Sequence, residues 1–190
     1  MKSIAFVLPL ALLAACNQKA GDAPAATGSV AAAKAPAGTE WVTTVVETPD
    51  GGMQMGNPNA PIKVVEYASM SCSHCADFSD AASEPLKAKY VSTGKVSYEL
   101  RNYVRDPMDM AATLLARCGG PGPFFPLSEQ LFADQRNWFV KAQTMTPADQ
   151  QSMAALPIGQ QTARFASFIG IDEFVRQRGV SAEKAGACLA

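Results

Sequence analysis

The stretch VVEYASMSCSHCADF, which spans Val64 to Phe78, decides the fold of this chain. Its apolar, Val-rich beginning predicts a strand, and the residues after it recur at helical spacing, so that both thiols lie at the start of a helix capped by Ser71. Free backbone N–H groups and the helix dipole stabilise a thiolate there. The pattern indicates redox chemistry, in which Cys72 is the nucleophile and the more shielded Cys75 resolves a mixed disulfide.

Two cysteines with this spacing also occur in zinc sites, at haem attachment sites and by chance. A haem site has a His directly after the second Cys, where this chain has Ala76. A zinc site needs two further ligands, and because the chain has a single His, these would have to be Cys118 and Cys188 or carboxylates. A redox pair is the favoured interpretation, and it needs no organic cofactor and no metal.

The residues VEYASMSCSHCADF resemble the active-site segment of the DsbA-like thiol:disulfide oxidoreductases, and a looser likeness extends from about Trp41 to the end of the chain. These proteins have a thioredoxin fold with an inserted helical domain. The resemblance implies an α/β fold with a thioredoxin-like core, whose first part lies at residues 41–105, and a helical insertion at residues 106–190. Ser73 stands where the strongly oxidising members have Pro, whereas His74 agrees with the family.

Two residues near the thiols are candidates for a supporting role. Glu66 shares a strand face with apolar residues, and the sequence alone allows either a solvent-facing or a buried carboxylate. The resemblance implies a buried acid beneath the thiols that assists proton transfer to and from Cys75, and burial without a partner raises a carboxyl pKa as that role requires. His74 lies within reach of the Cys72 sulfur and would stabilise its thiolate, unless it is a plain surface residue.

The remaining elements follow from periodicity. Residues 41–47 predict a strand at the sheet edge, residues 62–68 predict a central strand buried between helices, and residues 95–104 predict the next strand of a right-handed βαβ unit. After Asp106 no strand is predicted. Helices are predicted instead at residues 108–118, 127–135, 147–156, 158–169, 172–178 and 181–190. The expected core of these helices contains Phe124, Phe125, Leu131, Phe132, Trp138, Phe139, Phe165, Phe168 and Phe174.

The thioredoxin fold of the family continues, after the inserted helices, with a cis-proline loop, two strands and a last helix. The sequence up to Ala190 contains no segment of this kind. The resemblance therefore predicts that the sequence is truncated at its C-terminus. It also predicts that the strand at residues 64–68 lacks neighbours on one side.

The N-terminus has the pattern of an export signal. Residues 1–15 contain an apolar run too short to span a bilayer, and Leu13-Ala14-Ala15-Cys16 resembles the lipobox of bacterial lipoproteins, in which the Cys is acylated. The alternative is an ordinary signal peptide with a chance Cys. Residues 16–40 are rich in Ala, Gly and Pro and predict a disordered tether. The interpretation is a periplasmic protein anchored to a membrane by lipid, and Asn17 slightly favours the outer membrane.

Export places the cysteines in an oxidising compartment. The chain has five cysteines. With Cys16 acylated, Cys118 and Cys188 are left as a second pair beside Cys72 and Cys75. Similar extra pairs in some relatives favour a structural disulfide between Cys118 and Cys188, and two buried free thiols are the alternative. The net charge of −1 provides no basic surface for nucleic acid.

The sequence thus predicts an enzyme, an exported thiol:disulfide oxidoreductase that introduces disulfides into reduced exported proteins and exchanges electrons with a membrane or periplasmic redox partner. Two alternatives stay open. The protein could be a disulfide reductase or isomerase, which a reduction potential near that of thioredoxin would indicate. It could also be a non-catalytic lipoprotein with structural cysteines, for which an ordinary Cys72 pKa is expected.

Overall fold

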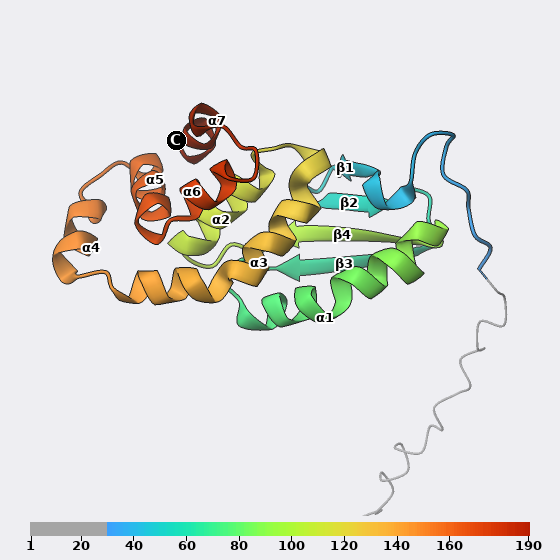
Figure 1. Ribbon diagram of the computed structural model, residues 1–190, viewed down its shortest axis with the longest axis horizontal. Helices are drawn as coiled ribbons and strands as arrows, with labels where there is room; N and C mark the ends of the chain where they lie inside the picture. The colour runs from blue at the N-terminus through green and yellow to red at the C-terminus, as the bar shows by residue number, and fades with distance from the viewer. Residues whose placement is uncertain (1–29) are drawn as a thin grey trace, which may run out of the picture. The chain divides into compact units, whose positions relative to one another are not determined.

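The computed structural model describes residues 30–190 (Figure 1). Within this range a small mixed sheet is followed by the helices α2 to α7, residues 107–189, which we call the helical half. The strands are β1 (Val45–Glu47), β2 (Met53–Gly56), β3 (Ile62–Ala68) and β4 (Val96–Asn102). The α-helices are α1 (Ser73–Lys89), α2 (Pro107–Arg117), α3 (Pro121–Gln143), α4 (Pro147–Ala154), α5 (Ile158–Ile169), α6 (Ile171–Arg176) and α7 (Ala182–Leu189).

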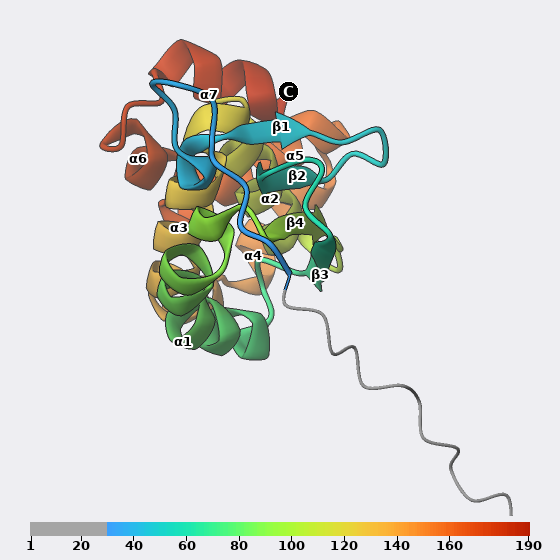
Figure 2. The same ribbon diagram turned by 90° about the vertical axis from the view of Figure 1, so that its right-hand side faces the viewer.

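The sheet has the strand order β1-β2-β4-β3. β4 pairs antiparallel with β2 and parallel with β3, in a register that places Ile62 opposite Val96 and Ala68 opposite Asn102. Helices α1 and α3 lie against one face of this sheet (Figure 2). Both β3 and β4 point with their carboxyl ends toward the helical half (Figure 1). The predicted βαβ unit is confirmed. In this unit the carboxyl end of β3 lies at the edge of the sheet that meets the helical half (Figure 1).

Within the described residues, the position of β3 in the sheet corrects the prediction of a central, buried strand and agrees with the prediction that this strand lacks neighbours on one side. In the part of the chain that the structure describes, β3 pairs with β4 alone and is an edge strand. Since the helices cover one face of the sheet, alternate side chains of β3 reach solvent: Val65 is 41% exposed and Tyr67 is 64% exposed. The apolar run therefore predicts the bounds of the strand correctly, Ile62 to Ala68, and predicts its position in the sheet wrongly.

The segment before β1 is also different from the prediction. Residues 41–43 form a 3₁₀-helix rather than the first half of a strand, because the hydroxyl groups of Thr43 and Thr44 donate to the Glu40 carbonyl and compete with a ladder. The Trp41 indole is buried and donates to the carbonyl of Ala33 at 2.7 Å. Part of the segment predicted as a tether therefore contacts the domain.

Strand β2 was not predicted. Its four residues, MQMG, contain no β-branched or aromatic side chain, and Gly56 has φ 105°, a conformation that other residues rarely adopt. The strand forms because it completes a hairpin with β1 and lies between β1 and β4, so that all four residues are buried. Its context in the sheet decides its structure.

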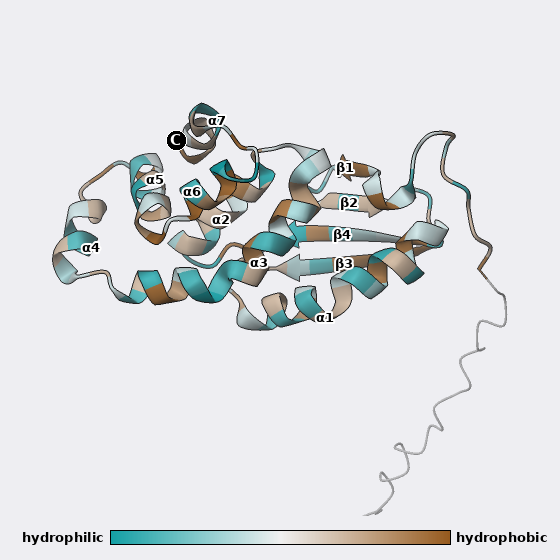
Figure 3. Ribbon diagram, viewed as in Figure 1, coloured by the Kyte–Doolittle hydropathy of each residue, from teal (hydrophilic) through white to brown (hydrophobic). Residues whose placement is uncertain are grey.

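The helical half agrees well with the prediction, and no strand follows Asp106 within the described residues. The main difference is α3, which begins six residues earlier and ends eight residues later than predicted. Pro121 and Pro123 lie in its first turn, where backbone N–H groups have no helical partner in any case. Hydrophobic and hydrophilic residues are interspersed along α3, as expected for a helix with one buried face (Figure 3). The predicted core residues Phe124, Phe125, Leu131, Phe132 and Trp138 are buried, and Phe139, Phe165, Phe168 and Phe174 pack partly buried against them.

No helix within residues 30–190 is long and apolar enough to cross a membrane. The predicted signal segment at residues 1–15 and the predicted lipidation site at Cys16 lie outside the described residues.

Cys118 and Cys188 form a disulfide that joins the end of α2 to α7, with their Cα atoms 5.9 Å apart. The two cysteines are 70 residues apart in the sequence, so the bond closes a long loop around most of the helical half. In the chain-entropy model, such a loop restricts the unfolded chain strongly and stabilises the folded protein.

We expect a variant with both Cys118→Ala and Cys188→Ala to lose on the order of 4 kcal/mol of unfolding free energy, because its unfolded chain is no longer cross-linked. Urea denaturation of the variant and the parent measures this difference. Peptide mapping without reductant provides the control, since it must recover a linked Cys118–Cys188 peptide from the parent. Labelling of both cysteines as free thiols in the unreduced parent would contradict the assignment.

Candidate active site

The loop Ser69–Cys72 connects β3 to α1 and carries the first reactive sulfur. Cys72, rather than the predicted Ser71, is the N-cap residue of α1, with φ −91° and ψ 119°. Ser71 is buried, and its hydroxyl donates to the carboxylate of Asp106 instead of to the helix start. Cys75 lies in the first turn of α1. The structure therefore places both thiols at the helix N-terminus, as predicted. The N-cap of the helix lies one residue later than predicted.

The pKa of Cys72 is lowered from its ordinary value. The largest cause is a hydrogen bond to its sulfur from the backbone N–H of Cys75. The Cys75 thiol, the backbone N–H of His74 and the positive charge of Arg105 act in the same direction. Partial burial opposes these effects without outweighing them. A thiolate at Cys72 is thus stabilised mainly by backbone groups at the start of α1.

The second thiol has the opposite preference. The pKa of Cys75 is raised to about 11, chiefly by burial. A hydrogen bond with the Ser69 backbone opposes this rise, whereas the hydrogen bond and charge of Cys72 and the charge of Glu66 contribute to it. At neutral pH, Cys75 is therefore a protonated thiol while Cys72 is more readily a thiolate. Two cysteines separated by one turn of helix thus have different roles: Cys72 attacks and leaves easily, and Cys75 keeps its proton.

Glu66 lies half-buried on β3, on the side of the strand opposite the exposed Val65 and Tyr67. Burial raises the pKa of its carboxyl, and a hydrogen bond from the Tyr98 hydroxyl on β4 lowers it in part. Tyr98 is itself buried beside Phe125, and burial raises its pKa so that it stays a neutral donor. The buried alternative for Glu66 is thus the one that the structure supports, and Tyr98 is a partner that the sequence did not indicate.

The imidazole of His74 is exposed on the first turn of α1. Its backbone N–H contributes to the low pKa of Cys72. The tuning role of its side chain stays a prediction.

Three residues of the site were not predicted. Arg105 follows β4, and its guanidinium donates to the hydroxyl groups of Ser69 and Ser71, which holds its charge near Cys72. Asp109 of α2 is fully buried and accepts the Met70 N–H at 2.8 Å. Gln135 of α3 donates its side-chain amide to two carbonyls of the same loop. No motif in the sequence indicates these residues, because they come from separate elements.

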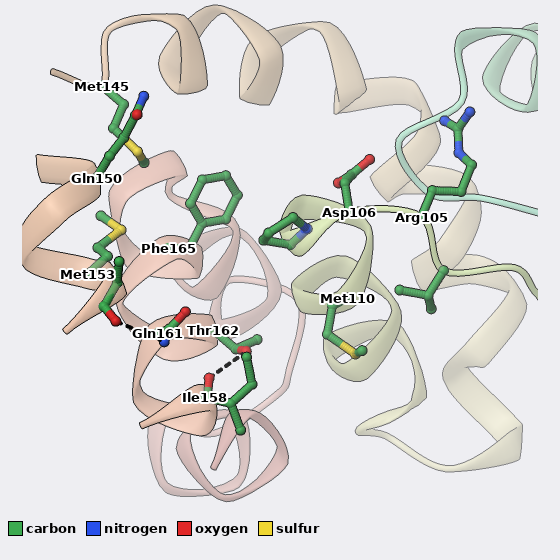
Figure 4. Close-up of a pocket in the computed structure, with 13 residues that line it drawn as sticks. Arg105, Asp106, Met110, Met145, Gln150, Met153, Ile158, Gln161, Thr162 and Phe165 are labelled. Atoms are coloured by element: carbon green, nitrogen blue, oxygen red, sulfur yellow. Dashed lines mark hydrogen bonds between the residues drawn. The ribbon is translucent and has the colours of Figure 1, made fainter. Parts of the chain in front are cut away.

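A pocket of about 470 Å³ lies between the start of α2 and helices α4 and α5. Arg105 and Asp106 lie at one end of its lining, and Met145 and Met153 lie at the other (Figure 4). Most of the remaining lining is apolar, including Met110 and Phe165. The pocket therefore adjoins the residues that bond to the hydroxyl of Ser71, directly before Cys72.

The fold and the site agree with a known family. The family described as thioredoxin matches residues 48–184, which include β2 to β4, the two thiols and most of the helical half. The chain belongs to this family. The thioredoxin-like fold predicted from the sequence is thereby confirmed.

Relatives within the same fold carry related names. A solved structure of a protein-disulfide isomerase from Novosphingobium aromaticivorans has 32% sequence identity and a TM-score of 0.67, with 72% of this chain and 69% of that one covered. A protein from Rickettsia bellii named "Putative protein-disulfide oxidoreductase" is 36% identical over 92 residues, and one of the same kind from Rickettsia conorii is 34% identical over 98 residues. These matches cover 48% and 51% of this chain and 36% and 35% of the two Rickettsia proteins, so the chain spans about a third of their length.

We expect thiolate absorbance at 240 nm, measured against pH in the reduced protein, to show one group that titrates below the ordinary thiol value of about 8.5. Because backbone N–H groups cause the low pKa, Cys75→Ser retains the titration and Cys72→Ser removes it. A titration that survives Cys72→Ser would contradict the assignment of the nucleophile.

Proposed function

We propose that this protein catalyses thiol–disulfide exchange with Cys72 and Cys75 as its redox pair. One observation carries the proposal: the two thiols lie one helical turn apart with pKa values displaced in opposite directions, low at Cys72 and high at Cys75. Purely structural cysteines have no need of this difference. The names of the relatives support the same chemistry.

The exchange follows from the protonation of the two sulfurs. In the oxidised protein a substrate thiolate attacks the Cys72 sulfur, the Cys72–Cys75 bond breaks, and Cys75 leaves and takes up a proton. A second substrate thiolate then attacks the substrate sulfur of the mixed disulfide and releases Cys72 as a thiolate. The substrate loses two electrons and forms a disulfide, and the protein gains them as a dithiol. Glu66 is suited to supply the proton, since its own pKa is raised and its negative charge raises the pKa of Cys75.

The oxidising direction is the one that we favour. A thiol of low pKa is a good leaving group, so it makes the disulfide form less stable relative to the dithiol and the protein a stronger oxidant. The reducing or isomerising direction uses the same thiols, with Cys72 attacking a substrate disulfide, and the name of the Novosphingobium relative makes isomerisation the second candidate. The reduction potential separates the two.

Reduced exported proteins are the substrates that we propose, with a membrane or periplasmic protein to restore the disulfide. The proposal of a periplasmic, lipid-anchored protein, with the outer membrane slightly favoured, is supported by the sequence Leu13-Ala14-Ala15-Cys16 and the apolar run before it.

A test of the function uses an unstructured peptide with two reduced cysteines and the fully oxidised protein. We expect the peptide to gain a disulfide at the rate at which the protein is reduced, and Cys72→Ser to abolish this. Equilibration with glutathione should give a potential well above that of thioredoxin, which is about −270 mV. A potential near the thioredoxin value would exclude the oxidising direction, and no exchange with the peptide or with glutathione would exclude the function. Cys118→Ala with Cys188→Ala is the control, because it leaves the redox pair in place.

The anchor has its own test. Expressed in a Gram-negative bacterium, the protein should fractionate with membranes and carry the added mass of acyl chains on Cys16, and Cys16→Ser should release it into the soluble periplasmic fraction. Equal distribution of both proteins would contradict lipidation. A cleaved but unacylated N-terminus would indicate an ordinary signal peptide.

A further inference from the structure

The internal hydrogen bonds of the loop that carries Cys72 involve Ser69, Ser71 and the Cys72 N–H, and none involves the peptide groups of Met70. The loop's one internal backbone bond joins the Cys72 N–H to the Ser69 carbonyl at 3.0 Å. The peptide groups of Met70 are bonded instead by side chains of the helical half: Asp109 accepts the Met70 N–H at 2.8 Å, and Gln135 donates to the Met70 carbonyl at 2.8 Å. Two helices therefore hold one residue of the loop from two directions.

Gln135 also contacts the nucleophile itself. Its Nε2 atom donates to the carbonyl of Cys72 at 3.0 Å, and this carbonyl accepts the first backbone bond of α1, from Ala76 at 3.1 Å. An amide nitrogen carries two hydrogens, so one side chain satisfies both loop carbonyls. Gln135 is only 2% exposed, and water is not available to replace it. The bonds of Gln135 thus connect α3 to the N-cap residue of α1.

We propose that Gln135 is a positioning residue for Cys72. By fixing the carbonyls of Met70 and Cys72, it sets the direction in which the Cys72 sulfur meets the N–H groups of His74 and Cys75. The strength of a hydrogen bond falls steeply with its angle, so a small rotation of the Cys72 backbone weakens these contacts. The inference rests on the proposed function in one respect, that Cys72 is the attacking sulfur.

A purely structural role for Gln135 predicts a different result. Loss of the Gln135 amide leaves the Met70 carbonyl without its donor, which lowers the stability of the fold, whereas the Cys72 carbonyl keeps its bond from Ala76. The chemistry of the sulfur then stays unchanged as long as the loop keeps its conformation. The pKa and the reactivity of Cys72 distinguish the two roles, whereas a melting temperature does not.

The experiment compares Gln135→Met with Ser128→Ala, both in the Cys75→Ser background, so that one reactive thiol remains in the pair. Methionine keeps the length and flexibility of glutamine and lacks the donor. Ser128 lies on the same helix, is 1% exposed and has no hydrogen-bond partner for its hydroxyl within the described residues, which makes it a matched control. Alkylation of Cys72 by iodoacetamide, followed against pH, reports both its pKa and its rate.

We expect the pKa of Cys72 to rise in Gln135→Met and its alkylation rate below that pKa to fall about fivefold, the effect of losing one ordinary buried hydrogen bond. Ser128→Ala should change neither. A Gln135→Met protein that melts at a lower temperature with an unchanged Cys72 pKa would overturn the proposal. Alkylation needs no substrate protein, so a chain that fails to oxidise a peptide contradicts the proposed function and leaves this comparison intact.

A second measurement needs no substitution at Gln135. In the Cys75→Ser protein, the two side-chain amide protons of Gln135 should shift in NMR spectra as Cys72 titrates, because the amide bonds to the carbonyls of Met70 and Cys72. Amide protons that do not respond to the titration would overturn the proposal even where Gln135→Met does not fold.

Discussion

Backbone N–H groups of His74 and Cys75 point at the Cys72 sulfur at the start of α1, where they have no carbonyl partner within the helix. These donors belong to the main chain, and the Cys75 thiol and the charge of Arg105 add to the stabilisation of the thiolate. Cys75, one turn further along, is inside the helix and more buried, and its pKa rises instead. A single helix start thus creates both an easily ionised thiol and a protonated one, which is the asymmetry that exchange chemistry needs.

This arrangement requires a fixed approach to the helix, and the helical half provides it. Asp109 and Gln135 bond the loop at Met70 and Cys72 from α2 and α3, while the Cys118–Cys188 disulfide joins α2 to α7. Asp109 is fully buried, and its carboxylate also accepts the backbone N–H of Arg105, whose guanidinium lies near the thiols. The helices are therefore part of the site itself, in addition to packing against the sheet.

Local signals made much of this structure predictable. The apolar run predicts β3 with its bounds, helical periodicity predicts α5 with its bounds, and the cysteine spacing locates the site. What failed depends on tertiary context: β2 has no strand-like composition and forms between two neighbours, and Trp41 turns to reach the Ala33 carbonyl. The residues that hold the loop, such as Gln135, could not be predicted, since a single buried amide in a helix has no sequence signature.

The edge position of β3 bears on how the site keeps its shape. An edge strand exposes N–H and C=O groups along one side, and the side chains of Val65 and Tyr67 add apolar surface there. The last residue of β3, Ala68, is nevertheless fully buried, and its carbonyl accepts the N–H of Tyr103. From Ser69 onward the chain is bonded by the helical half rather than by strands. The geometry at Cys72 is therefore determined by contacts with the helical half. The pKa values of the thiols do not depend on hydrogen bonds along the unpaired side of β3.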